Sequence, residues 1–298
     1  MRVAVTGANG LLGGAAVMQL GPEHEVLALG RGPARLPPGR YRWADADLGD
    51  GVSVERALRG FGAEAVLHAG AATDVDGCER DPDLAWRVNV GGTEQVARAC
   101  RALGARLVAV STDYVFDGTA GPYGEEAVPN PRGVYARTKR CAEEAALLLA
   151  PRCAVARVAV VFSGRAGAKS TFATQVVEKL SRGEQVRAFS DQIVSPTLAE
   201  HGAEMCLELL LASDHLGVLH TSGATALDRV ELARRIARRF GLEGEIVPVL
   251  TADVRLPAPR PLRVGLVTGR AAALLKAKPL PIDEAIDRFH RQWVERGR

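Results

Sequence analysis

The stretch Arg2-Val-Ala-Val-Thr6-Gly7-Ala-Asn-Gly10-Leu-Leu-Gly13 decides the fold of this chain. A short apolar run is followed by three glycines at intervals of three residues, and then by a helical pattern. Glycine allows a tight turn after a strand, and the free N–H groups that open the next helix attract a pyrophosphate. The stretch therefore predicts a strand, a dinucleotide-binding turn and a helix. A tight turn that binds no ligand is the alternative.

The same rhythm continues through the first half of the chain. Continuous β-branched runs such as Arg2–Thr6 and Arg106–Ser111 are what a parallel sheet covered on both faces requires. Further strands are predicted at Glu25–Leu29, Tyr41–Ala44, Ala65–Ala69 and Ala154–Val161, and helices at Leu11–Leu20, Val52–Arg59, Asp83–Leu103 and Val134–Leu149. Alternating strands and helices predict an α/β fold with a doubly wound parallel sheet, of the Rossmann type.

The second half has a less regular pattern. Helices are predicted at Ser170–Arg182, Thr197–Ala212, Asp228–Phe240 and Ile282–Arg296, without an internal repeat or a low-complexity linker. We therefore expect a dinucleotide-binding domain at residues 1–163 and a smaller substrate-binding lobe at residues 164–298. A segment at about residues 190–215 is expected to return to the first domain.

The length, composition and net charge of the chain restrict the class of protein. The chain has 298 residues, a hydrophobic content of 47% and a net charge of +3 spread along the sequence. This charge is too small and too dispersed to predict a nucleic-acid or anionic-membrane partner. The five cysteines are odd in number and scattered, which is typical of reduced thiols and not of a zinc site. No apolar run is long enough for a membrane span, so a cytoplasmic enzyme without a metal is expected.

The end of the second predicted strand indicates which dinucleotide binds. NAD-binding proteins usually place an acidic residue there, whereas this chain has Gly30-Arg31, with Arg35 nearby. A guanidinium suits a 2′-phosphate, so NADP(H) is favoured over NAD(H). Arg31 as a solvated loop charge is the alternative. Asp47 and Leu48, after the third strand, are candidates for the adenine ring, although Asp47 could equally cap the next helix.

Three segments at carboxyl ends of predicted strands carry polar groups. They are His68-Ala-Gly-Ala-Ala-Thr73, Ser111-Thr112-Asp113-Tyr114 and the helix that bears Tyr135 and Lys139. Tyr135 and Lys139 are four residues apart and share a helix face, so the ammonium is expected to lower the pKa of the phenol. Thr112 would orient a substrate oxygen, Tyr135 would give it a proton, and Lys139 would hold a ribose. This set predicts carbonyl reduction. Turn caps and an exposed tyrosine are the alternatives for the single residues.

These motifs resemble the extended short-chain dehydrogenase/reductase superfamily and, within it, the dTDP-4-dehydrorhamnose reductase family. The most specific stretch is Ser111-Thr-Asp-Tyr-Val-Phe-Asp-Gly118, accompanied by Tyr135-Ala-Arg-Thr-Lys139 and Asp191-Gln-Ile-Val-Ser-Pro-Thr197. The resemblance implies NADPH-dependent reduction of a 4-keto-6-deoxyhexose carried on dTDP, giving dTDP-L-rhamnose. It implies catalytic roles for Thr112, Tyr135 and Lys139. The implied cofactor residues are Gly7, Asn9, Gly10, Leu11, Gly13, Ala69, Gly70, Ala71 and Ser111, besides Tyr135 and Lys139. The implied substrate residues are Thr73, Asp74, Val75, Asp113, Tyr114 and Arg260.

The chain departs from the family pattern in the predicted sugar pocket. Val160 stands where the family usually has an aromatic residue, Val264 and Val267 replace a Ser and an Asp, and Ala72 replaces a common Tyr. Three functions therefore stay open: a nucleotide-sugar reductase, an epimerase or dehydratase that retains NAD, and a non-catalytic NADP-binding regulatory subunit. A homodimer is one option for the assembly.

Overall fold

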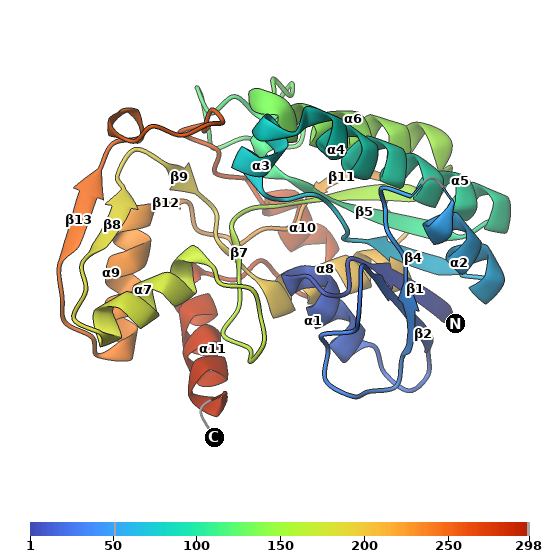
Figure 1. Ribbon diagram of the computed structural model, residues 1–298, viewed down its shortest axis with the longest axis horizontal. Helices are drawn as coiled ribbons and strands as arrows, with labels where there is room; N and C mark the ends of the chain where they lie inside the picture. Colours follow the sequence, from blue (N-terminus) through green and yellow to red (C-terminus); the bar gives the residue numbers. More distant parts are fainter. Residues whose placement is uncertain (51, 297–298) are drawn as a thin grey trace.

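The computed structural model describes residues 1–50 and 52–296. Its centre is a seven-stranded sheet in the order β11-β6-β5-β4-β1-β2-β3, with every neighbouring pair parallel (Figure 1). The strands are β1 (Arg2–Thr6), β2 (Glu25–Gly30), β3 (Arg42–Asp45), β4 (Ala65–His68), β5 (Arg106–Thr112), β6 (Cys153–Val158) and β11 (Gly217–His220). The chain reverses its direction across the sheet between β1 and β4, which confirms the predicted doubly wound fold.

Helices cover both faces of the sheet. Side chains of β1 alternate, with Val3 and Val5 in the core beneath α1 (Leu11–Gln19) and α8 (Ala199–Leu211). Ala4 points into the other core, under α2 (Ser53–Phe61), α5 (Gly92–Leu103) and α6 (Gly133–Leu149). Burial on both faces explains why the strands read as continuous apolar runs.

The long helix predicted at Asp83–Leu103 is interrupted. It starts as α4 (Pro82–Trp86), where the Asp81 carboxylate accepts a hydrogen bond from the Leu84 N–H at 3.0 Å. A π-helical turn (Arg87–Gly91) then joins it to α5. The extra residue of a π turn re-aims side chains, and here it contains the buried Asn89. The short helix α3 (Val75–Arg80) was not predicted.

The strand predicted at Ala154–Val161 is shorter than expected. β6 ends at Val158, and Val160 has a φ of +39°, which is unfavourable for a β-branched residue. The chain leaves the sheet there and forms β7 (Val161–Phe162), which pairs with β10 (Thr197–Leu198). Residues Thr197–Leu198 were predicted as the first turn of a helix, but α8 begins only after them.

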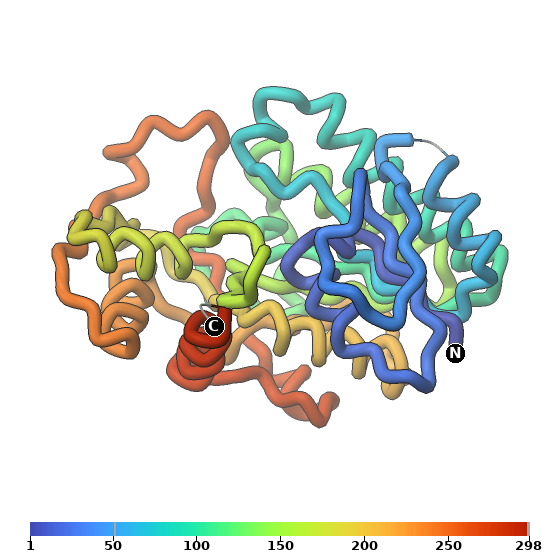
Figure 2. Tube along the Cα trace, turned by 60° about the horizontal axis from the view of Figure 1, so that its bottom comes forward, coloured from blue at the N-terminus to red at the C-terminus, as the bar shows by residue number. Residues whose placement is uncertain are grey.

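Most of the remaining elements lie beside the part of the chain that forms the sheet (Figure 2), and they enclose a separate apolar cluster. This cluster involves α7 (Phe172–Ser181), α9 (Arg229–Phe240) and α11 (Ile282–Glu295). The short strands next to it are β8 (Val186–Phe189), β9 (Ile193–Val194), β12 (Leu227–Asp228) and β13 (Ile246–Val249); α10 (Gly269–Leu274) packs near β11 instead. α8 packs on α1 and on the central sheet. The division into domains at residues 163 and 164 stays a prediction.

Among residues 1–50 and 52–296, no helix combines the length and the apolar character that a membrane crossing would need.

Candidate active site

The glycine turn is held by close backbone contacts. Gly7 has a φ of +68°, and a Cβ at this position would lie 2.6 Å from backbone atoms of Gly70. A Cβ at Gly13 would lie 2.4 Å from the carbonyl oxygen of Gly7. Both positions therefore require glycine, as expected for a turn that packs a helix tightly on a strand. No side chain caps the start of α1, so no side chain competes with a ligand for its first N–H groups.

One cavity of about 520 Å³ joins this turn to the predicted catalytic residues. Most of the predicted site lines it: Gly7, Gly10, Leu11, Gly13, Ala69, Gly70, Ala71, Thr73, Val75, Ser111, Thr112, Asp113, Tyr114, Tyr135 and Lys139. These residues come from the carboxyl ends of β1, β4 and β5 and from α6, where ligands bind in sheets of this kind.

Thr112, Tyr135 and Lys139 meet at the carboxyl end of β5. The Thr112 hydroxyl donates to Asp113 Oδ1 at 3.0 Å and accepts from the Tyr114 N–H at 3.2 Å. The ring of Tyr135 lies edge-on to that of Tyr114, with the ring centres 5.8 Å apart. Lys139 is 5% exposed, and its Nζ donates to the Val110 carbonyl at 2.9 Å. A hydroxyl, a phenol and an ammonium thus border the same space.

The predicted lowering of the Tyr135 pKa by Lys139 is wrong for this structure. Burial raises the pKa of Tyr135, and the hydrogen bond with Thr112 opposes that rise only in part. Burial also lowers the pKa of Lys139 to about 8, although the nearby carboxylate of Glu143 partly restores it. Loss of water around the charged form is therefore the largest influence on both pKa values, and Lys139 is not among the influences on Tyr135. Tyr135 keeps its proton at neutral pH.

Asp113 is a buried acid inside the cavity. It is 1% exposed, and its Oδ2 has no hydrogen-bond partner among the described residues. Burial raises its pKa to about 7, although the Thr112 hydroxyl and the charge of Arg229 act in the opposite direction. A buried carboxyl oxygen without a hydrogen-bond partner destabilises the folded protein, so this atom is a candidate for a hydrogen bond with a ligand.

Two buried side chains fix the loop after β4. His68 Nδ1 lies 2.7 Å from Thr6 Oγ1, its Nε2 lies 3.0 Å from Thr93 Oγ1, and burial lowers its pKa to about 3. The Asn89 amide bonds both backbone groups of Ala72 and donates to Thr138 Oγ1 at 3.0 Å. His68 is thus a neutral structural residue, and Asn89 ties the loop to α6.

Asn9 does not line the cavity but holds the loop that follows β2. Its amide donates to the carbonyls of Arg31 at 3.3 Å and Pro33 at 3.0 Å, and its Oδ1 accepts from the Arg35 N–H at 2.8 Å. The side chains of Arg31 and Arg35 are exposed and form none of the ion pairs between the described residues. Asn9 therefore fixes the backbone from which two unpaired guanidinium groups extend.

Four other predicted residues also lie outside the cavity. Asp47 accepts the Gly49 N–H at 2.8 Å in a turn, and Leu48 packs against Gly70 and Gly92. Asp74 is exposed and lies 3.6 Å from Arg80. Arg260 is held 2.9 Å from Asp76 and also donates to the Ala258 carbonyl, so its charge is already paired.

The substrate side of the cavity contains residues that sequence reasoning missed. They are Lys169, Ser170, Thr171, Phe172, Arg229 and Leu232, from the start of α7 and the start of α9. The strained Val160 lies among them, whereas Val264 is buried in a small core cluster. No motif distinguishes these positions, because only the packing of the second lobe brings them to β5.

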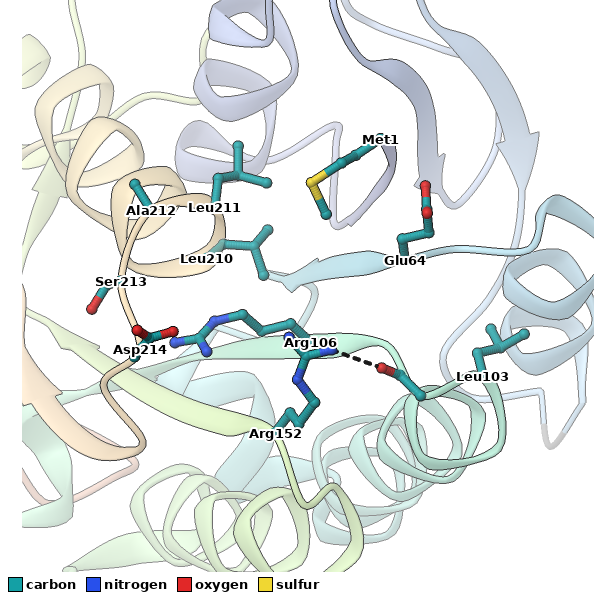
Figure 3. A pocket seen from close by; sticks show the side chains of 11 residues that line it. Met1, Glu64, Leu103, Arg106, Arg152, Leu210, Leu211, Ala212, Ser213 and Asp214 are labelled. Carbon is teal, nitrogen blue, oxygen red and sulfur yellow. Dashed lines mark hydrogen bonds between the residues drawn. The ribbon is translucent and has the colours of Figure 1, made fainter.

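A second cavity, of about 560 Å³, lies at the amino ends of β1, β4, β5 and β6, and Figure 3 shows the side chains that line it. Arg106 is 7% exposed there and donates to the carbonyls of Leu209 at 3.3 Å and His215 at 2.7 Å, at the end of α8. Arg152 donates to the Gly104 carbonyl, at the end of α5. Arginine at helix carboxyl ends satisfies free carbonyls and offsets the helix dipole. The two arginines on this cavity wall therefore cap the carboxyl ends of α8 and α5.

Comparison with known proteins gives the family. The sequence matches the RmlD substrate binding domain family over residues 1–294. The chain belongs to this family. The RmlD match confirms the resemblance read from Ser111–Gly118 and Tyr135–Lys139, and with it the class of NAD(P)-dependent oxidoreductases.

Individual relatives agree with this assignment. The chain is 37% identical over 267 residues to dTDP-4-dehydrorhamnose reductase of Mycobacterium tuberculosis, covering 87% of this chain and 82% of that protein. The solved dTDP-4-dehydrorhamnose reductase of Bacillus anthracis in complex with NADP has a TM-score of 0.86 and 26% identity, over 98% of this chain and 99% of that chain. The chain is also 31% identical over 265 residues to methionine adenosyltransferase 2 subunit beta of Xenopus tropicalis, covering 87% and 78%.

Proposed function

We propose that this RmlD family member reduces the 4-keto group of a nucleotide-linked 6-deoxyhexose with NADPH. The proposed substrate is dTDP-4-dehydro-L-rhamnose and the product dTDP-L-rhamnose. The observation that carries the proposal is the shared cavity, in which Thr112, Tyr135 and Lys139 face the glycine turn. The relatives of known name support the choice of substrate.

The residues present fit a dinucleotide. The diphosphate would lie at Gly10 and Leu11, where the uncapped start of α1 offers N–H groups. The small residues Ala69, Gly70 and Ala71 leave room along the end of β4. Arg31 and Arg35, on the loop that Asn9 holds, would bind the 2′-phosphate of NADPH. When bound, the nicotinamide supplies a hydride to the carbonyl carbon.

The chain supplies the proton and the orientation. Tyr135, whose pKa burial raises, holds a proton that the carbonyl oxygen takes up as it gains negative charge. The Thr112 hydroxyl lies beside this position and would orient the oxygen. Lys139, fixed by the Val110 carbonyl, would bind the nicotinamide ribose. A proton from solvent then restores Tyr135.

The substitution Tyr135→Phe tests this assignment. The ring and its packing remain, so NADPH should bind as in the wild type, whereas substrate-dependent NADPH oxidation should fall by at least about 100-fold. Absorbance at 340 nm follows the oxidation, and nucleotide fluorescence follows binding. A variant with near wild-type turnover would remove Tyr135 from the mechanism.

A non-catalytic regulatory subunit is the second candidate. It is favoured by the likeness to methionine adenosyltransferase 2 subunit beta and by the altered positions Val160, Val264 and Val267. The complete set of Thr112, Tyr135 and Lys139 favours the reductase instead. Absence of turnover on any ketosugar nucleotide, together with capture of a partner enzyme, would support the regulatory function.

The proposed setting of the enzyme is the cytoplasm. The five cysteines are all free thiols, and four of them are buried. Scattered, unpaired cysteines are typical of reducing compartments.

A further inference from the structure

Arg229 is a charged group without a counter-charge inside the active-site cavity. Its Nε donates to Gln192 Oε1 at 3.0 Å, and its guanidinium carbon lies 5.5 Å from the centre of the Phe172 ring. These two contacts fix the plane of the guanidinium. Among the described residues, neither terminal nitrogen has a hydrogen-bond partner and no carboxylate pairs with it.

Neighbouring arginines are neutralised. Arg235, on the same helix, pairs with Glu231 at 2.7 Å and with Asp283 at 2.9 Å. Arg260 pairs with Asp76 at 2.9 Å. Arg229 has no such partner among residues 1–50 and 52–296. Burial removes water from its guanidinium, and this is the largest influence on its pKa, which it lowers. A partly buried, unpaired cation is destabilising unless a ligand supplies the missing charge.

Asp113 does not fill this role. Asp113 also lines the cavity, and its buried Oδ2 has no hydrogen-bond partner among the described residues, but it forms no ion pair with Arg229. The carboxyl pKa is raised to about 7 even though Arg229 is near. The residues that line the cavity therefore include one unpaired donor group and one unpaired acceptor.

We propose that Arg229 anchors an anionic group of the substrate, a phosphate or a carboxylate, on the side of the cavity opposite the glycine turn. Its two free terminal nitrogens match the two oxygens of such a group. Lys169, also on the cavity wall, adds positive charge to the same side. This inference rests on the proposed function and replaces Arg260 as the anchor. The proposed substrate offers that chemistry in the diphosphate of its nucleotide. A carboxylate on the sugar is the other source, and the 6-deoxyhexose proposed above does not carry one.

Calorimetric titration of the full chain tests the anchor. The probes are dTDP, UDP-glucose and UDP-glucuronate. All three carry a diphosphate, and only UDP-glucuronate has a carboxylate on its sugar. Arg229→Gln should weaken binding by about 10- to 100-fold, since it removes a charge-assisted pair of hydrogen bonds. Arg229→Lys keeps the charge and should lose less of the binding affinity. Arg235→Gln is the matched control, on the same helix but outside the cavity, and should change affinity by less than about twofold.

The pattern of loss identifies the group. An equal loss for all three probes assigns the diphosphate, whereas a loss confined to UDP-glucuronate assigns a sugar carboxylate. Arg229→Gln affinities equal to those of Arg235→Gln, or a wild-type chain that binds none of the probes, would overturn the inference. The proposed function is judged separately by NADPH oxidation, so a reductase whose Arg229→Gln variant binds normally would retain the function and lose the anchor.

Discussion

At the scale of the residue, burial decides the chemistry of the side chains more than their neighbours in sequence do. The spacing of Tyr135 and Lys139 predicted that both border one cavity, and they do. The same spacing predicted an acidic phenol, whereas burial raises its pKa. A one-dimensional pattern shows which groups can meet, but the cost of removing water from them depends on the packed structure.

Asp113 gives a prediction for stability against pH. Its pKa is raised from 3.8 to about 7, so between these values the folded protein keeps a proton that the unfolded chain has released. Stability should therefore fall as the pH rises through this range. Asp113→Asn removes this fall, and its stability relative to the wild type should rise by about 2–4 kcal/mol between pH 4 and pH 8. Urea unfolding at both pH values measures it. His68 titrates in both proteins and cancels, so a constant difference would contradict the raised pKa.

At the scale of the element, Asn9 connects the glycine turn to the loop after β2. Its amide donates two hydrogen bonds, to Arg31 and Pro33, and accepts one from Arg35. Asn9→Ala should leave the diphosphate site intact but let this loop move, because the bonds that fix it are lost. We expect adenosine 2′,5′-bisphosphate to bind about 3- to 10-fold more weakly, with the affinity for 5′-ADP unchanged.

Titration of the two adenine nucleotides separates this effect from general damage to the turn. Arg40→Ala, at an exposed position near the loop, is the control and should alter neither affinity. Equal weakening of both nucleotides would show that Asn9 supports the turn as a whole and has no selective effect on the 2′-phosphate.

The helix that bears Tyr135 is fastened to the sheet by a buried ion pair. Glu143 of α6 binds Arg157 of β6 through two hydrogen bonds of 2.8 and 2.7 Å, and their side chains are 1% and 2% exposed. Glu143→Ala leaves the guanidinium buried and unpaired, so the free energy of unfolding should fall by about 3–5 kcal/mol. Glu144→Ala, one residue on and exposed, should cost less than about 1 kcal/mol. Chemical denaturation of both variants decides this; similar losses would contradict the role of the pair.

At the scale of the whole molecule, the sequence predicted the sheet, the redox half of the site and four residues on its substrate side (Thr73, Val75, Asp113 and Tyr114). It missed the residues that the second lobe adds to the substrate side. Gly7, Thr112 and Tyr135 stand in or beside local patterns of strand, turn and helix, so their meeting at one sheet edge follows from topology. Arg229 and Lys169 reach the cavity through contacts between segments far apart in the chain. The periodicity of apolar residues in the sequence does not reveal such contacts. The resemblance suggested Arg260, but Asp76 already pairs with it.

The central claim is that Tyr135 completes a hydride transfer to a ketosugar in a single cavity. The most direct test of this claim is an isotope-labelling experiment. NADPH that carries deuterium on the transferred position is mixed with dTDP-4-dehydro-L-rhamnose, and the mass of the product is measured. We predict one deuterium on the former carbonyl carbon of each product molecule, with one NADPH consumed, and loss of this product in Tyr135→Phe. An epimerised or dehydrated product without the label, or no turnover at all, would contradict the account.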